Sequence, residues 1–227
     1  MSKKSNGRNA ARALLLGVCV ALLPVFPTAG VPVGEWRFDD STNLLRAASG
    51  QALVLSGTFT SATGTTPADG AVRIGIGSFL RCSHGIAPNG GGTNVNEYSV
   101  VWDFSYPDSS AGHWMSLLQT SGSNTDDGDL FIRGTDRALG IGAAGYSSKA
   151  TEPATWYRLT LSVKNGSWYR LYLNGSLLLN GISQPVDGRF SLTTNLLFAA
   201  DNDGEDYPVD LARIAVYDHA LSSDEAA

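Results

Sequence analysis

The chain has 227 residues but only two cysteines, Cys19 and Cys82. Cys19 lies in an apolar N-terminal run that we expect to be removed, so Cys82 would remain alone and no intramolecular disulfide could form. Basic residues are also scarce, since 16 Lys and Arg stand against 21 Asp and Glu, for a formal net charge of −5. Nucleic acids and anionic membrane surfaces are therefore not expected partners, because they repel an acidic protein. Stability must come from a packed core.

Long hydrophobic runs are absent after the first 30 residues. Within residues 1–30, four bases precede an apolar run, residues 13–26, that is too short to span a bilayer comfortably. Small residues at Ala29 and Gly30 suit cleavage before Val31. These features predict a signal peptide over residues 1–30, hence a secreted or periplasmic protein without a membrane span in the mature chain. Its removal would change the formal charge from −5 to −9.

Catalytic motifs are mostly missing as well. The three histidines are His84, His113 and His219. They show no metal-ligand spacing and lie near no Gly-x-Ser-x-Gly elbow. Glu35 and Asp39 share one face of the first predicted strand, but Arg37 lies between them, which is typical of an edge charge ladder rather than of a glycosidase carboxylate pair. We therefore expect a protein that is not an enzyme.

The remaining chain has the pattern of β-structure. Short alternating runs are separated by Gly, Asn, Asp and Ser clusters, and no amphipathic helix of three turns is found, so residues 31–227 are predicted to be one all-β domain. Residues 195–200 and 209–217 are predicted strands, and a Ser-Ser-Asp-Glu helix start follows at 222–225. One strand has five large side chains expected on its core face: Tyr98, Val100, Trp102, Phe104 and Tyr106.

A hairpin is predicted over residues 157–173, around Asn-Gly. A two-residue turn would mix its polar and apolar faces, so a three-residue loop fits better. This register pairs Leu161 with Tyr169 on the core face and Ser162 with Trp168 on the other. The loop would then consist of Lys164, Asn165 and Gly166.

The second face of this hairpin combines rings and guanidinium groups. Rings lie flat against the apolar faces of sugars, and arginines donate hydrogen bonds to hydroxyl or acidic groups. The alternative is a structural role, in which a loop covers the rings or Arg158 stacks on the opposite Tyr172. The predicted ligand-binding residues are Arg158, Trp168, Arg170 and Tyr172.

Residues 201–210 contain five acids and no base. Such carboxylates repel one another unless they are solvated or share a cation, and oxygen-only ligands suit calcium. A second acidic loop lies at residues 124–129. Neither loop has EF-hand spacing, so a cation site would have to be assembled from loops distant in sequence. A solvated turn is the alternative to a calcium site formed by Asp201, Asp203, Glu205 and Asp206.

Four short segments resemble laminin-G-like domains of the concanavalin A-like lectin/glucanase superfamily: residues 34–39, 156–159, 171–175 and 212–222. The resemblance covers essentially residues 31–227. It implies a two-sheet antiparallel jelly-roll β-sandwich in which the first and last strands pair, frequent calcium binding, and glycan or protein ligands. Members differ so much in ligand that the fold does not determine the function.

A narrower resemblance is to a bacterial branch of accessory modules found beside metallophosphoesterases or other secreted enzymes, at residues 116–120, 127–132, 187–190 and 201–205. The sequence therefore predicts an exported, non-catalytic module that binds a glycan, or a cell-surface or extracellular protein, with calcium supporting its loops. Two alternatives stay open. One is a glycan-cleaving enzyme of the same fold, either a glycoside hydrolase or a polysaccharide lyase, and the other is a structural adhesion module without a small-molecule site.

Overall fold

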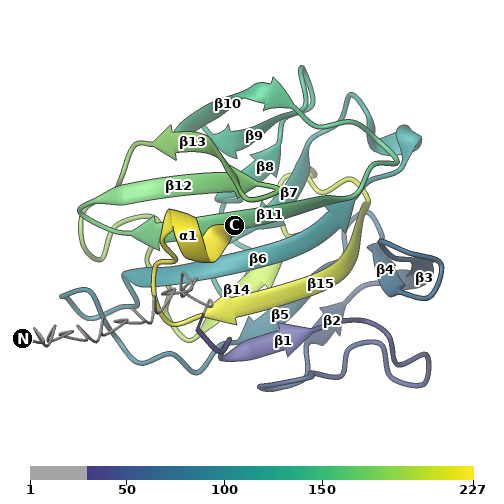
Figure 1. Ribbon diagram of the computed structural model, residues 1–227, viewed down its shortest axis with the longest axis horizontal. Helices are drawn as coiled ribbons and strands as arrows, with labels where there is room; N and C mark the ends of the chain where they lie inside the picture. The colour runs from purple at the N-terminus through teal and green to yellow at the C-terminus, as the bar shows by residue number, and fades with distance from the viewer. Residues whose placement is uncertain (1–29) are drawn as a thin grey trace, which may run out of the picture.

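The computed structural model describes residues 30–227, so the predicted signal peptide lies, apart from Gly30, outside the described residues. The secondary structure is nearly all β (Figure 1). No helix in the described part is long and apolar enough to cross a membrane. The elements are β1 Gly34–Trp36, β2 Val54–Ser56, β3 Phe59–Thr63, β4 Gly70–Ile74, β5 Phe79–Ser83, β6 Glu97–Ser105, η1 Asp108–Ser110, β7 Met115–Leu118, β8 Leu130–Ile132, β9 Ala138–Ile141, β10 Gly145–Ala150, β11 Tyr157–Lys164, β12 Trp168–Leu173, β13 Ser176–Gly181, β14 Asn195–Phe198, β15 Val209–Tyr217 and α1 Ser223–Ala226.

The strands form two layers, which confirms the predicted antiparallel β-sandwich. One layer is an eight-stranded sheet in the order β13-β12-β11-β6-β15-β4-β3, with β1 paired to β15. The other combines the sheets β10-β9-β8-β7 and β14-β5-β2, which Gln119 and Leu197 join through reciprocal backbone hydrogen bonds of 2.9 Å. Gly34 pairs with Val216, so the first and last strands are neighbours as the resemblance implied.

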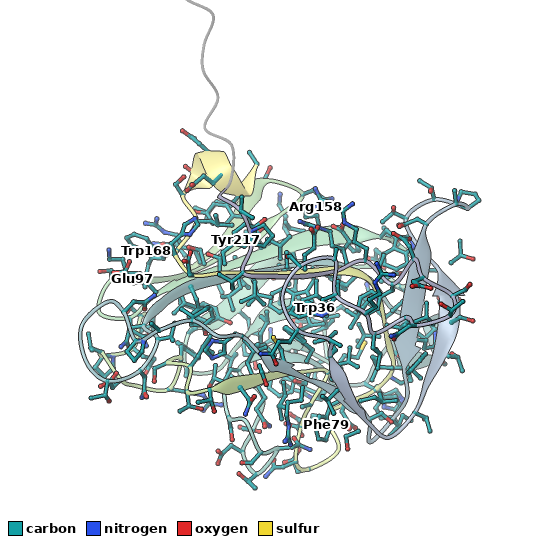
Figure 2. All side chains as sticks on the ribbon, turned by 90° about the horizontal axis from the view of Figure 1, so that it is seen from below. Trp36, Phe79, Glu97, Arg158, Trp168 and Tyr217 are labelled. Atoms are coloured by element: carbon teal, nitrogen blue, oxygen red, sulfur yellow. The ribbon has the colours of Figure 1, made fainter. Side chains whose placement is uncertain are left out.

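The core lies between these layers and uses the alternation predicted for residues 98–106. All five predicted core side chains of that segment are fully buried. Trp102 of β6 and Trp36 of β1 each pack edge-on against Phe198 of β14, with ring centroids 6.1 and 6.4 Å apart. Figure 2 shows Trp36 between the two layers. These rings stabilise the contact between the two sheets by burying apolar surface.

The hairpin of β11 and β12 has a different register from the prediction. Leu161 pairs with Leu171, and Ser162 pairs with Arg170, so the loop consists of residues 165–167. The predicted pairing partners were therefore wrong by two residues, and the predicted loop, residues 164–166, was wrong by one. The assignment of residues to the two faces was right, because side chains alternate with a period of two and an even shift leaves them on the same face.

The loop's own hydrogen bonds explain this register. The Asn165 side chain is buried and donates to Oδ1 of Asn96 at 3.0 Å, while the Asn165 N–H donates to the Asn96 carbonyl at 2.9 Å. The turn closes with a 2.9 Å hydrogen bond from the Ser167 N–H to the Lys164 carbonyl. Gly166 takes its third position at φ 83°, a left-handed conformation that favours glycine.

The outer face of the large sheet is partly covered by the C-terminal segment. Helix α1 begins at the predicted Ser-Ser-Asp-Glu motif, with a capping box between Ser222 and Glu225. The Ser162 hydroxyl of β11 donates to the Leu221 carbonyl at 2.8 Å, and the Leu221 N–H donates to the Ser99 hydroxyl of β6 at 2.8 Å. Figure 1 shows α1 in front of these strands. The segment therefore restricts how much of this face remains open to a ligand.

Candidate functional site

Two loops bring four carboxylates together at one edge of the sandwich. Asp127 comes from the loop that precedes β8, whereas Asp201, Asp203 and Glu205 follow β14. One carboxylate oxygen from each of these residues lies within 4.8 Å of the others. We call Asp127, Asp201, Asp203 and Glu205 the acidic cluster. Its assembly from separate loops agrees with the prediction that no single loop would form the site.

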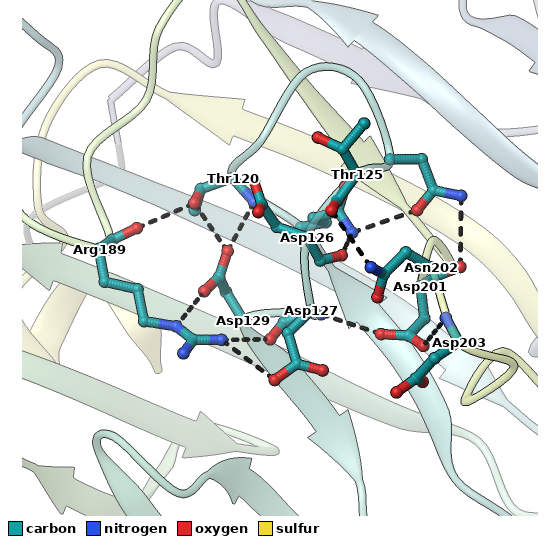
Figure 3. A network of polar contacts seen from close by, with 12 residues as sticks. Thr120, Thr125, Asp126, Asp127, Asp129, Arg189, Asp201, Asn202 and Asp203 are labelled. Atoms are coloured by element: carbon teal, nitrogen blue, oxygen red, sulfur yellow. Dashed lines mark hydrogen bonds and ion pairs between the residues drawn. The ribbon is translucent and has the colours of Figure 1, made fainter.

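Asp201 is the central residue of the acidic cluster. Its side chain is 4% exposed, and one carboxylate oxygen accepts from the Gly128 N–H at 3.0 Å. The other oxygen accepts from the N–H groups of Asp203 and Glu205 at 3.0 and 3.2 Å. Figure 3 shows the contact between Asp201 and Asp203 and the side-chain hydrogen bond from Asn202 to the loop of Thr125. The Asn124 side chain donates a further hydrogen bond between the loops, to the Asp201 carbonyl. The two loops are thus fixed relative to each other by several hydrogen bonds.

The charges of the acidic cluster are poorly compensated. Burial, followed by the negative charges of Asp203, Asp201 and Asp127, raises the pKa of Glu205 to about 6. The side-chain contact with Asp201 raises the pKa of Asp203. For Asp201, burial acts in the same direction, but hydrogen bonds from Asp203 and Gly128 lower its pKa overall. Carboxylates this close favour a shared proton or a bound cation.

A hollow of about 340 Å³ adjoins the acidic cluster at Asp127. Its wall includes Asp129, which is 4% exposed and accepts from Arg189 at 2.7 Å and from the Thr120 hydroxyl at 2.7 Å (Figure 3). Burial raises the pKa of Asp129 despite these donors. Arg189 reaches Asp127 only at 3.8 Å. This arginine therefore neutralises Asp129 more than it neutralises the acidic cluster.

Three of the four predicted calcium ligands meet in the acidic cluster, and Asp206 does not. The Asp206 carboxylate instead accepts from the Gly77 N–H at 2.9 Å, in the turn between β4 and β5. Its side chain is separated from the others because it follows Glu205 at the point where the chain turns toward β15. Asp127 takes the fourth position. The acidic composition of residues 124–129 pointed to this loop but not to this residue.

The four predicted ligand-binding residues share the outer face of the large sheet, and they differ in exposure. Trp168 and Arg170 are half-buried and adjacent, with the Arg170 guanidinium 4.6 Å from the centre of the Trp168 ring. Arg158 makes a two-point ion pair with Asp103 at 2.7 Å. Tyr172 is 2% exposed. Figure 2 shows Trp168 and Arg158 on the side of the sheet where α1 lies.

A charged cleft of about 400 Å³ lies on the same face, toward β1. Glu35 is held there by Arg213 and Arg37, at 2.8 and 3.2 Å. Burial opposes these contacts, but their hydrogen bonds lower the pKa of Glu35 overall. A general acid of a glycosidase needs the opposite shift. The pairing of Glu35 with arginines matches the predicted charge ladder, but β1 ends at Trp36, so Asp39 lies beyond the strand and does not share its face with Glu35.

Comparison with known families decides the family of this chain. A laminin-G family model, described as the concanavalin A-like lectin/glucanases superfamily, matches residues 92–227. The chain belongs to the concanavalin A-like lectin/glucanase superfamily. No curated protein sequence matches it. Membership of this superfamily agrees with the two antiparallel layers and with the pairing of β1 and β15.

Several solved structures share the fold at low sequence identity. Domain 4 of AbnA, an extracellular arabinanase from Geobacillus stearothermophilus in complex with arabinotriose, is 17% identical, with a TM-score of 0.62 over 87% of this chain and 97% of that domain. The sialidase of Trypanosoma rangeli is 16% identical, with a TM-score of 0.61, over 92% of this chain and 34% of that protein. The botulinum neurotoxin serotype D ligand-binding domain in complex with N-acetylneuraminic acid is 13% identical, with a TM-score of 0.57, over 86% and 49% of the two chains. The fold thus occurs in carbohydrate-binding and glycosidase-associated domains alike.

Proposed function

We propose that this protein is an exported, non-catalytic carbohydrate-binding module whose acidic cluster binds calcium. The observation that carries the proposal is the meeting of Asp127, Asp201, Asp203 and Glu205 within 4.8 Å. Calcium prefers carboxylate oxygens and tolerates flexible geometry, so this oxygen-only set fits the ion. A cation there would offset the mutual repulsion that raises the pKa of Glu205. Its role would be to brace the two loops.

Carbohydrate binding is supported by the ligands of proteins that share this fold. Two structural neighbours were solved with arabinotriose and with N-acetylneuraminic acid. We assign the ligand surface to Trp168 and Arg170, whose ring and guanidinium remain partly exposed on the outer face. Arg158 and Tyr172 would support this surface, the first through Asp103 and the second through burial. A cell-surface or extracellular glycoprotein would present the same kind of ligand.

The absence of catalysis is supported by the state of the carboxylates on the outer face. Glu35 and Asp103 are both paired with arginines, at 2.8 and 2.7 Å. Burial would raise the pKa of Glu35, but the hydrogen bonds from Arg213 and Arg37 lower it overall. Glycoside hydrolysis needs one carboxylic acid that keeps its proton near neutral pH. Export is supported by the signal-like composition of residues 1–30.

A glycan array probed with the protein, once with calcium and once with a chelator, tests the proposal. We expect binding to a restricted set of glycans, weakened by the chelator, and no release of reducing sugar from the bound glycans. The matched variant Asp203→Asn should lose the calcium effect because it removes an exposed carboxylate of the acidic cluster. Binding to no glycan under either condition, or turnover of a bound glycan, would contradict the proposal.

A further inference from the structure

A separate hollow of about 640 Å³ lies between residues 83–95 and residues 192–195. It is at the opposite end of the β5–β14 pair from the acidic cluster. Leu80 pairs with Phe198 at the end near Asp201, whereas Ser83 pairs with Asn195 at the end where the hollow opens. Its volume is in the range that small-molecule sites occupy, roughly 300–1,000 Å³. A ligand here would therefore not touch the acidic cluster.

The walls of this hollow are fixed by hydrogen bonds. Val95 and Leu192 exchange two backbone hydrogen bonds of 3.0 and 2.9 Å, which join the two segments at the base. The Asp187 carboxylate accepts from the N–H groups of Thr93 and Asn94 at 2.7 and 2.9 Å and so holds one wall. A pre-formed site loses little conformational entropy on binding, because few groups have to be ordered by the ligand.

The lining of the hollow carries no net charge. It includes no Asp, Glu, Lys or Arg among the residues that the structure describes. Its one titratable side chain, His84, is 6% exposed, and its Nδ1 accepts from the Ile86 N–H at 3.0 Å. The Nε2 then carries the proton and donates to the Thr193 carbonyl at 2.9 Å, which defines a neutral ring. Burial lowers the pKa of His84 and favours the same state. An ionic ligand would find no opposite charge here.

The polar groups of the lining suit hydroxyls. The Ser83 hydroxyl donates to Oδ1 of Asn195 at 2.7 Å, so the lone pairs of Ser83 remain available as acceptors. The Asn195 amide contributes donors, and Thr193 is exposed beside it. Ile86 and Pro88 add apolar surface. Hydroxyls combined with apolar C–H faces are the chemistry of an uncharged sugar.

We propose that this hollow is a second saccharide site, selective for short uncharged oligosaccharides and independent of any cation. The inference rests on the proposed function only for the class of ligand, since it uses none of the same residues. Selectivity would come from the absence of charge in a protein that is otherwise acidic. A carboxylated sugar would lose hydration there without gaining a cationic partner.

Titration with arabinotriose and with N-acetylneuraminic acid, followed by amide NMR shifts and calorimetry, tests this site. We expect arabinotriose to shift the amide signals of Gly85 and Thr193, equally with calcium and with chelator, and N-acetylneuraminic acid to leave them unchanged. Asn195→Ala should weaken arabinotriose binding about fivefold to tenfold, the loss expected for one hydrogen bond. Ala87→Trp should abolish binding by filling the hollow from its exposed rim. Ile76→Trp, at a 60% exposed position outside the lining, is the matched control.

The outcomes separate this site from the proposed function. Binding that is lost in Ala87→Trp but retained in Asp203→Asn supports the second site, even where calcium has no effect. Binding that survives Ala87→Trp but is lost with chelator and in Asp203→Asn overturns the second site and leaves the proposed function intact. If millimolar arabinotriose leaves the amide NMR signals of Gly85 and Thr193 unchanged, the second site is also overturned.

Discussion

Asp201 accepts a hydrogen bond from the Gly128 N–H at 3.0 Å, and this contact joins two acidic loops that are far apart in the sequence. The same carboxylate accepts from the N–H groups of Asp203 and Glu205. A single buried side chain thus organises both halves of the acidic cluster. Its structural role is separate from any role as a metal ligand, and the two can be measured separately.

Asp201→Ala should lower the free energy of unfolding by about 1–3 kcal/mol, because backbone donors, including the buried Gly128 N–H, lose their acceptor. Asp203→Ala should change it by less than about 0.5 kcal/mol, since the Asp203 side chain is exposed. Urea denaturation in the presence of chelator measures both values. Equal losses in the two variants would show that Asp201 does not organise the loops.

Calcium should raise the melting temperature because it binds the folded state and not the unfolded state. The rise should grow with the ratio of the calcium concentration to its Kd. Asp127→Asn should reduce this rise as much as Asp203→Asn does, because both carboxylates belong to the acidic cluster. Asp206→Asn should retain most of it, since that carboxylate faces Gly77. A calcium effect that depends on Asp206 and not on Asp127 would favour the ligand set predicted from the sequence over the acidic cluster.

Without calcium, stability should fall as the pH rises from 4.5 through about 6. The reason is that the pKa of Glu205 is raised from 4.5 to about 6, so over this interval the folded state binds more protons than the unfolded state. Because Glu205 is partly exposed, the effect should be no more than about 1 kcal/mol. Glu205→Gln should flatten this part of the stability profile, measured by thermal melts in chelator. An unchanged slope would exclude Glu205 as its source.

Much of the fold could be predicted because the strands show a local alternation of core-facing and outward-facing side chains. The period of two in residues 98–106 identified a core strand, and residues 209–217 were predicted with the bounds that β15 has. The hairpin register could not be predicted, since it depends on hydrogen bonds between Asn165 and Asn96, which are distant in sequence. The side chains were nevertheless assigned to the correct faces, because the pairing partners are shifted by two residues and side chains alternate between the faces with a period of two.

In the candidate sites, too, residues close in sequence could be predicted together, whereas contacts between distant segments could not. Asp201, Asp203 and Glu205 are close in sequence and were predicted together, whereas Asp127 joins them only through folding. The cover over the outer face likewise comes from the chain's own C-terminal segment, held by Ser99 and Ser162. Serines inside strands give no sign of such a partner.

Export predicts that residues 1 to about 30 are removed, with cleavage near Ala29-Gly30 before Val31. N-terminal sequencing of protein recovered from the culture medium or the periplasm would show the first residue of the mature chain. We expect a start at or within a few residues of Val31. Recovery of exported protein that begins at Met1 or Ser2 would rule out the signal peptide.

Trp168→Ala should weaken glycan binding by roughly 1–3 kcal/mol, because truncating a partly exposed aromatic side chain at a binding surface removes contact area from the complex. Its effect on the free energy of unfolding should stay near 1 kcal/mol, since the ring is half-buried and its main polar contact is a 3.2 Å hydrogen bond to the Ser162 hydroxyl. Tyr172→Ala is the matched control on the same face. Its ring is 2% exposed, so this variant should lose about 3 kcal/mol of stability or more.

The two variants together distinguish a ligand surface from a packed one. Calorimetric titration with the glycan selected on the array measures the first effect, and urea denaturation measures the second. If Trp168→Ala costs as much stability as Tyr172→Ala and leaves glycan affinity unchanged, then Trp168 packs against its neighbours Lys164 and Arg170 and binds no sugar. A loss of affinity with normal stability would instead assign the ligand to this face, because a ring that the fold does not need would then be contributing to the complex alone.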